Sequence, residues 1–273
     1  MKTKAVLFLL LVGVVVFGGY ALYQFVLGPT LPPSGAATPI PVTSNEKNPS
    51  SSNAEAAYPS PMETQAVSAP STEIGNAYPD PQELSDSTPS IDSSQIIFQI
   101  DPAKSLARFT IYEELRGSPK DVIGETNLVS GEILVNQNDL SQSKVGTIQI
   151  NARDFTTDDE RRNSAIRNRI LQTDTYEYIL FTPTSIEGLS GSGEVGKTYT
   201  FRLTGDLTIR EVTQSVTFEV TVLAESPQRL SGTAVATIRR SDFNLIVPNV
   251  PFVANVADEV KVELIFVAIP KSS

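Results

Sequence analysis

Residues 147–181, TIQINARDFTTDDERRNSAIRNRILQTDTYEYILF, decide the fold, because they place the only convincing helix pattern of the folded part between two strand patterns. At the start of the stretch, isoleucines alternate with polar residues, the period-two pattern of a strand with one buried face. The period then changes, because Thr157 and Glu160 fit a capping box and apolar residues follow at helical spacing. We expect one short helix over about residues 158–170, closing a structure built of strands.

The predicted helix carries most of the charge of this stretch. Its acids, Asp154, Asp158, Asp159 and Glu160, lie where capping and the helix dipole favour carboxylates, and they lack the loop spacing and glycine turn of a calcium site. Its arginines are Arg161, Arg162, Arg167 and Arg169. Arginines in this pattern form either a solvated face or a clamp for an anionic headgroup. We predict no metal site and no cofactor.

Three compositions follow one another along the 273 residues. Residues 1–27 are apolar after two lysines, residues 28–93 hold 12 of the 19 prolines, and residues 94–273 are rich in valine, isoleucine, leucine and phenylalanine. Only the last range can bury a sizeable core. The net charge of −10 divides into +2, −7 and −5 over these ranges, so no continuous basic surface exists for a nucleic acid.

The apolar run at residues 5–27 predicts a membrane-spanning helix, because 23 residues at a rise of 1.5 Å span roughly 35 Å. Basic residues precede the run and none follows it closely, so we expect the N-terminus inside and the rest of a single-pass protein outside the cytoplasm. The alternative is a cleaved signal peptide, for which Gly19 and Ala21 offer a cleavage site.

The Pro/Ser-rich range 28–93 predicts a disordered linker, because it has too few large apolar residues to offset the entropy of ordering. Within it, AYPSP at Ala57 recurs as AYPDP at Ala77. The repeat is either a recognition motif in polyproline II conformation or a duplication in a spacer. We expect residues 94–273 to fold without this linker.

Several half-buried strands follow one another after residue 94 without intervening helices. The clearest alternation runs over residues 199–210, where Phe201, Leu203 and Leu207 fall on one face and polar residues on the other. This pattern predicts an antiparallel sheet curled into a barrel. Small residues recur on the predicted inner faces: Ala152, Gly205, Ala234 and Ala236. An eight-stranded barrel is either filled by side chains or holds one ligand, and composition does not decide between them.

Catalysis is disfavoured by the residue types that are missing from the chain. It contains no cysteine and no histidine, so thiolate nucleophiles, zinc-thiolate sites and the usual general base are excluded. No Gly-x-Ser-x-Gly elbow is present either. The apolar segment at residues 243–253 contains two prolines, so we expect it to be a lid over one end of the barrel or a membrane-facing loop.

Four segments together resemble the YceI-like family of polyisoprenoid-binding periplasmic proteins. They are FQIDPAKSLARFTI at residues 98–111, RNRILQTDTYEYILF at 167–181, LTGDLTIREVTQSVTFEV at 203–220 and ATIRRSDFNL at 236–245. The resemblance runs over about residues 97–267. The sequence departs from the family pattern at Glu177, where a proline is expected, at Glu211, where a glycine is expected, and in having no histidine in the helix segment.

The resemblance implies an antiparallel lipocalin-like barrel that holds a long prenyl chain inside, without catalysis. Combined with the alternation, it predicts ligand-binding side chains on the dry faces of separate strands: Phe109, Ile111, Phe181, Phe201, Leu203, Leu207, Phe218 and Val220. Arg161, Arg162 and Arg167 are the predicted headgroup contacts. The expected partners are an isoprenoid or other long-chain lipid and the membrane, with a homodimer left open. The alternative function is a stress-response or cell-envelope protein-interaction module whose barrel is filled by side chains.

Overall fold

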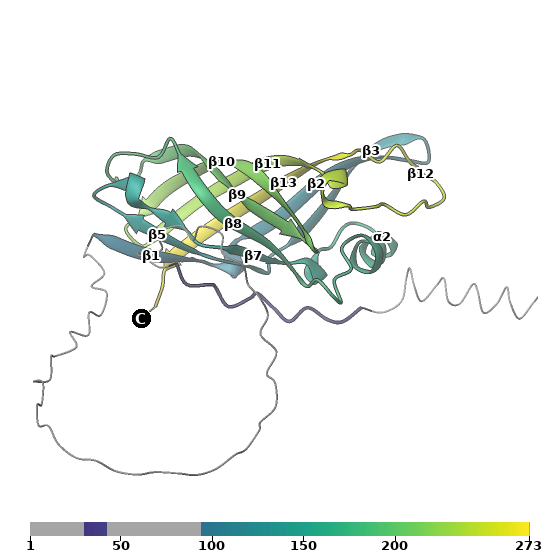
Figure 1. Cartoon of the computed structure of the whole chain (residues 1–273), viewed down its shortest axis with the longest axis horizontal. Helices are drawn as coiled ribbons and strands as arrows, with labels where there is room; N and C mark the ends of the chain where they lie inside the picture. Colours follow the sequence, from purple (N-terminus) through teal and green to yellow (C-terminus); the bar gives the residue numbers. More distant parts are fainter. Residues whose placement is uncertain (1–29, 43–93, 273) are drawn as a thin grey trace, which may run out of the picture. The chain divides into compact units, whose positions relative to one another are not determined.

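A computed structural model describes residues 30–42 and 94–272, and in the second range an antiparallel sheet of 13 strands curls into a half-barrel with one short helix (Figure 1). The predicted all-β antiparallel class with one helix is confirmed. The strands are β1 (Gln95–Ile100), β2 (Leu106–Leu115), β3 (Ser118–Thr126), β4 (Val129–Ser130), β5 (Glu132–Asn136), β6 (Lys144–Val145), β7 (Ile148–Asn151), β8 (Tyr178–Glu187), β9 (Thr198–Ile209), β10 (Val212–Ser226), β11 (Arg229–Arg239), β12 (Val253–Ala254) and β13 (Glu259–Pro270).

The pairing of the strands makes the sheet curl. From β7 the path runs through β8, β9, β10, β11 and β13 to β1 and then to β5, while β4, at the other end of the path, pairs with β7. Only Gly131 separates β4 from β5, so both ends of the path return to one short segment. β2 continues the direction of β1 along β13 and pairs with β3 on its other side.

Strand β9 shows how the alternation in the sequence becomes an inside and an outside. Its partner β10 runs antiparallel to it from the Val212–Ile209 pair to the Leu223–Thr198 pair. Alternate residues of β9 are buried, namely Phe201, Leu203, Gly205, Leu207 and Ile209, whereas Arg202 and Asp206 are exposed. The dry face and the wet face predicted for this strand are therefore confirmed.

The helical segment follows β7 in the chain. It consists of η3 (Ala152–Asp154), α2 (Glu160–Ala165) and a π-helical turn, η4 (Ile166–Ile170); shorter turns are η1 (Pro102–Lys104), η2 (Leu140–Gln142) and η5 (Arg240–Phe243). The predicted position of the helix is confirmed, but the predicted cap at Thr157 is wrong. The N-cap is Asp159, whose carboxylate accepts from the backbone N–H groups of Arg161 and Arg162. Thr157 instead donates its hydroxyl to Asn163 Oδ1 over 2.7 Å.

The proline-rich residues 30–42, which we call the strap, lie against the curled sheet. The strap is hydrogen-bonded to side chains of residues 132–178, for example from Val42 N to Glu132 Oε2 over 3.1 Å. These contacts differ from the expectation of a disordered linker over residues 28–93, which assigned this part no partner on the domain. Residues 43–93 of that linker lie outside the described residues, as does the predicted membrane span at residues 5–27. Among the residues that are described, no helix is long and apolar enough to cross a membrane.

Candidate ligand cavity

Two apolar cavities lie inside the curled sheet. The cavity beside α2, which we call the helix-end cavity, has a volume of about 240 Å³ and is lined by side chains of β2, β8, β9, β10 and β13 together with the helical segment. The other, which we call the far-end cavity, has a volume of about 140 Å³ and extends to the turn between β8 and β9. The walls of both are almost entirely aliphatic and aromatic, as in pockets that bind apolar ligands.

Ile148, Leu203, Ala234 and Leu264 line both cavities, and we call this boundary between them the neck. Each of these residues comes from a different strand, namely β7, β9, β11 and β13. Ala234 contributes only a methyl group, so the neck is wider on that side than a larger residue would allow. The cavities therefore run one after the other along the inside of the sheet and together suit a long, thin molecule.

All eight residues predicted to contact a ligand line these cavities. Phe201 and Val220 line the far-end cavity, Leu203 lines both, and the others line the helix-end cavity: Phe109, Ile111, Phe181, Leu207 and Phe218. Phe181 and Phe218 pack edge to face, with ring centroids 4.9 Å apart. Period-two alternation combined with the family resemblance led to these positions, and every one of them lies on a strand. That they contact a ligand stays a prediction.

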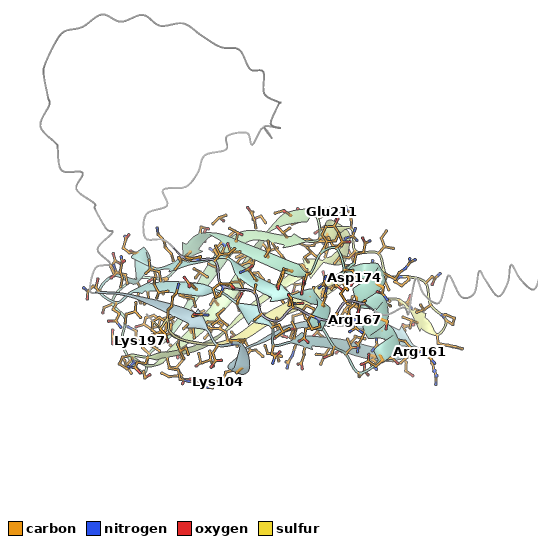
Figure 2. All side chains as sticks on the ribbon, turned by 90° about the horizontal axis from the view of Figure 1, so that it is seen from below. Lys104, Arg161, Arg167, Asp174, Lys197 and Glu211 are labelled. Carbon is orange, nitrogen blue, oxygen red and sulfur yellow. The ribbon has the colours of Figure 1, made fainter. Side chains whose placement is uncertain are left out.

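The three arginines predicted to bind a headgroup do not converge on one point. Arg162 lines the helix-end cavity, Arg167 lines a polar surface hollow beside η4, and Arg161 is exposed. Figure 2 shows Arg161 and Arg167 at the α2 end of the molecule and Lys197 at the opposite end. Of the three, only Arg162 is placed to face a molecule inside the helix-end cavity, and the headgroup role stays a prediction.

Arg162 already has two carboxylate partners. Its guanidinium lies 2.8 Å from Glu113, which is buried on β2, and 2.5 Å from Asp158. The hydrogen bond from Lys120 holds the pKa of Asp158 below its usual range, and Arg162 lowers it further, although partial burial opposes both. Arg162 therefore places a charge that two carboxylates compensate at the end of an apolar cavity.

Sequence reasoning missed the residues that cover the helix-end cavity. The helical segment contributes Ile166, Ile170 and Leu171, and the loop after η5 contributes Leu245 and Val247. The loop was expected to be a lid or a membrane-facing surface, and the structure places it over this end of the cavity. It has no periodic pattern from which inward residues could be chosen. At the other end, Phe98, Ile100 and Phe266 line the far-end cavity, and the alternation of β1 and β13 could have identified them.

Within residues 30–42 and 94–272, no group of three or more acidic, histidine or cysteine side chains is arranged to hold a metal ion. The polar groups that reach the helix-end cavity are Arg108, Glu113, Arg162, Arg240 and Glu263. Arg108 and Arg162 form ion pairs with Glu125 and Glu113 at 2.6 Å and 2.8 Å. Paired ions at the edge of an apolar cavity suit binding of an amphiphile.

Comparisons with known proteins agree with this architecture. The YceI-like domain matches residues 98–268. A polyisoprenoid binding domain from Saccharophagus degradans, implicated in plant cell wall breakdown, is 14% identical with a TM-score of 0.51, over 64% of this chain and 99% of that one. BcnA of Burkholderia cenocepacia is 24% identical with a TM-score of 0.48, over 62% of this chain and 98% of that one.

The YCEI protein of Campylobacter jejuni is 16% identical with a TM-score of 0.43, over 53% of this chain and 82% of that one. No curated protein matches the chain. The structure from S. degradans shares the fold, and the family match covers the sheet from β1 to β13. Because that match spans more than half of the sequence, the protein belongs to the YceI-like family.

Proposed function

We propose that this protein is a membrane-anchored, extracytoplasmic and non-catalytic binding protein for an isoprenoid lipid or a similar long-chain amphiphile. The observation that carries the proposal is the pair of neighbouring apolar cavities that share the lining residues Ile148, Leu203, Ala234 and Leu264. A long chain lying lengthwise in a lipocalin-like barrel would occupy both. The name of the relative from S. degradans, a polyisoprenoid binding domain, supports the same ligand class.

The affinity in this proposal comes mainly from apolar area. Burial of apolar surface contributes roughly 25 cal/mol per Å², so an extended prenyl chain needs few polar contacts to bind usefully. Arg162 at the helix end would face the polar group of such a chain. The proposal includes anchorage through residues 5–27 in the cell membrane, with the domain outside the cytoplasm.

Substitution at the neck tests whether the ligand lies inside. Ala234→Phe places a ring between the two cavities, and we expect it to weaken binding of a fluorescent prenyl analogue at least tenfold. Overpacking is expected to cost about 1 to 3 kcal/mol of stability, so folding is checked by circular dichroism. The matched control is Thr233→Phe, the neighbouring position, whose side chain is exposed on the outer face.

The control should bind the analogue as the natural chain does. If Ala234→Phe is folded and binds equally well, the ligand is not inside the sheet, and the protein-interaction module becomes the better hypothesis. Mass spectrometry of small molecules extracted from the purified protein then identifies the natural ligand.

A further inference from the structure

The strap is held against the sheet by side chains of β7 and β5 rather than by strand pairing. Gln149 and Asn151 alternate with the cavity-facing Ile148 and Ile150, so their amides point outward, and they donate to the strap carbonyls of Thr38 and Gly35 over 2.9 Å each. This arrangement suits the prolines of the strap, which lack an N–H group for a sheet ladder.

Buried polar groups of the domain depend on these contacts. Asn151 is fully buried, and its amide bonds to Gly35 of the strap and to Glu177. Glu132 is 1% exposed and accepts from Val42 N and from Lys271. Because a buried polar group without a partner costs about 1 to 3 kcal/mol, the strap completes the domain surface at both places.

The strap has a defined direction. Leu31 N donates to Asp174 Oδ1 over 2.9 Å, just after η4, whereas Val42 at the other end reaches Glu132 on β5. In Figure 1 the strap is the purple segment, which runs from beneath α2 past β7. Its N-terminal end therefore lies beside the helix-end cavity.

Both ends of the undescribed range 43–93 are attached to the same part of the sheet. Val42 is bonded to Glu132, and the carbonyl of Ser94 accepts from Gln137 N over 2.9 Å. Positions 132 and 137 are about 17 Å apart along an extended strand. The strap therefore contacts the domain before residue 43, so the range 43–93 does not lie between the strap and the domain.

Only residues 28 and 29 remain between the predicted membrane span and the strap. Leu31 comes four residues after the end of the span, at most about 14 Å along a fully extended chain. Asp174, its partner, lines the surface hollow beside η4 together with Ile246. The helix end of the domain is thus the end that the chain can bring to the bilayer.

The same end carries exposed apolar side chains. Ile246 is 76% exposed and Phe252 is 71% exposed, both in the loop between η5 and β13. Phe252 adopts a φ of 72°, which a bulky residue rarely does, and its carbonyl is fixed by the backbone N–H of Arg116 over 2.7 Å. The Arg116 guanidinium lies 5.8 Å from the centroid of the Phe252 ring, which is nevertheless largely exposed. Ile246 and Phe252 are therefore apolar side chains that this end of the domain offers to a lipid surface.

We propose that the strap fixes the domain on the lipid bilayer with the helix end and its loop in contact with the membrane, so that a lipid passes between bilayer and cavity there. This inference rests on the proposed function, since it takes residues 5–27 as a retained anchor. The partner that the exposed loop contacts is the bilayer in which that anchor is inserted. A domain on a 66-residue tether would have no such fixed orientation.

The absence of cysteine allows the orientation to be measured in the full chain. Ile246→Cys places a fluorescent label on the loop at the helix end, and Val195→Cys places one at the far-end cavity, where the valine is 61% exposed. In phosphatidylcholine vesicles containing a nitroxide-labelled lipid, we expect quenching of the label at 246 to exceed that at 195 severalfold.

Two insertions of the same ten glycine and serine residues provide the matched test. Between residues 29 and 30 the insertion should abolish the difference in quenching, because it separates the strap from the anchor. Between residues 60 and 61 it should leave the difference unchanged. Equal quenching at 246 and 195 in the natural chain, or equal effects of the two insertions, would overturn the proposal.

Two further measurements on the same preparations separate this inference from the proposed function. Binding of the prenyl analogue in detergent reports the cavity alone. If the analogue binds but the labels at 246 and 195 are quenched equally, the fixed orientation on the bilayer is contradicted and the lipid-binding function is not. The intact mass reports the N-terminus, and loss of the span contradicts both the anchor and the orientation. If binding fails while the label at 246 is still quenched, the fixed orientation stands and the lipid-binding function does not.

Discussion

Gly205 lies where β8 and β9 approach too closely for any side chain. A Cβ atom at this position would lie 2.6 Å from the carbonyl oxygen of Thr182 and 2.7 Å from Cα of Pro183, next to the irregular pairing of β8 between Pro183 and Ser185. Backbone atoms cannot move aside as the end of a flexible side chain can. The glycine is thus required by the sheet itself and is not spare room for a ligand.

We expect Gly205→Ala to lower the free energy of unfolding by about 1 to 3 kcal/mol, the usual cost of overpacking. The control is Asp206→Ala, at the next position of β9, where the side chain is exposed. Urea unfolding of both variants measures the effect. Equal stability of the two variants would show that β8 moves away without cost.

At the scale of elements, the strands and their inward residues were predictable from the sequence. The contacts of the strap and of the α2 arginines were not. Alternation in β9 identified the inward residues because a strand with one wet face repeats every two residues. The strap has no period, and its partners are side chains 90 or more residues away, such as Glu132 for Val42 and Asn151 for Gly35. The arginines of α2 could not be assigned for the same reason, since the partner of Arg162 is Glu113 on β2.

Glu177 links the strap to the charges beneath it. Burial by itself would raise the pKa of Glu177, but hydrogen bonds from Ser34 and Asn151 and the charge of Arg153, 2.8 Å away, bring the pKa below its usual range. The other titratable groups nearby are Tyr178 and Asp174. The Tyr178 hydroxyl is hydrogen-bonded to the Ser34 hydroxyl over 2.7 Å, and the Asp174 carboxylate lies 4.0 Å from the Arg153 guanidinium.

This pKa shift predicts a pH dependence with a defined sign. Because the folded pKa of Glu177 is lower than the unfolded value of about 4.3, its contribution to stability is complete above that pH and is lost as the pH falls through the folded value. Urea unfolding from pH 7 to 3 should therefore show a smaller loss of stability for Glu177→Gln than for the natural chain. The exposed Glu219→Gln, which also removes one carboxylate, should follow the natural chain. Parallel curves for all three proteins would contradict the assignment.

At the scale of the whole molecule, the position of the strap makes the fate of the N-terminus decisive. If residues 5–27 are a retained anchor, the helix end stays near the bilayer; if they are cleaved as a signal peptide, the strap begins close to a free end. We expect protein recovered from membranes to keep its original N-terminal residues. Intact-mass spectrometry checks this, and a mature N-terminus near Tyr20 or Leu22 would contradict it.

The neck between the two cavities has a consequence for the kind of molecule that can be held. A ligand that fills both cavities has to pass these four side chains, Ile148, Leu203, Ala234 and Leu264, and a ring system needs a wider passage there than a linear chain does. Since the helix end is the side we expect to face the bilayer, a ring-bearing lipid would come to rest tail first, with its ring left in the wider cavity. We therefore expect the residues at this boundary to select ligands by cross-section, whereas the apolar walls alone would select only by polarity.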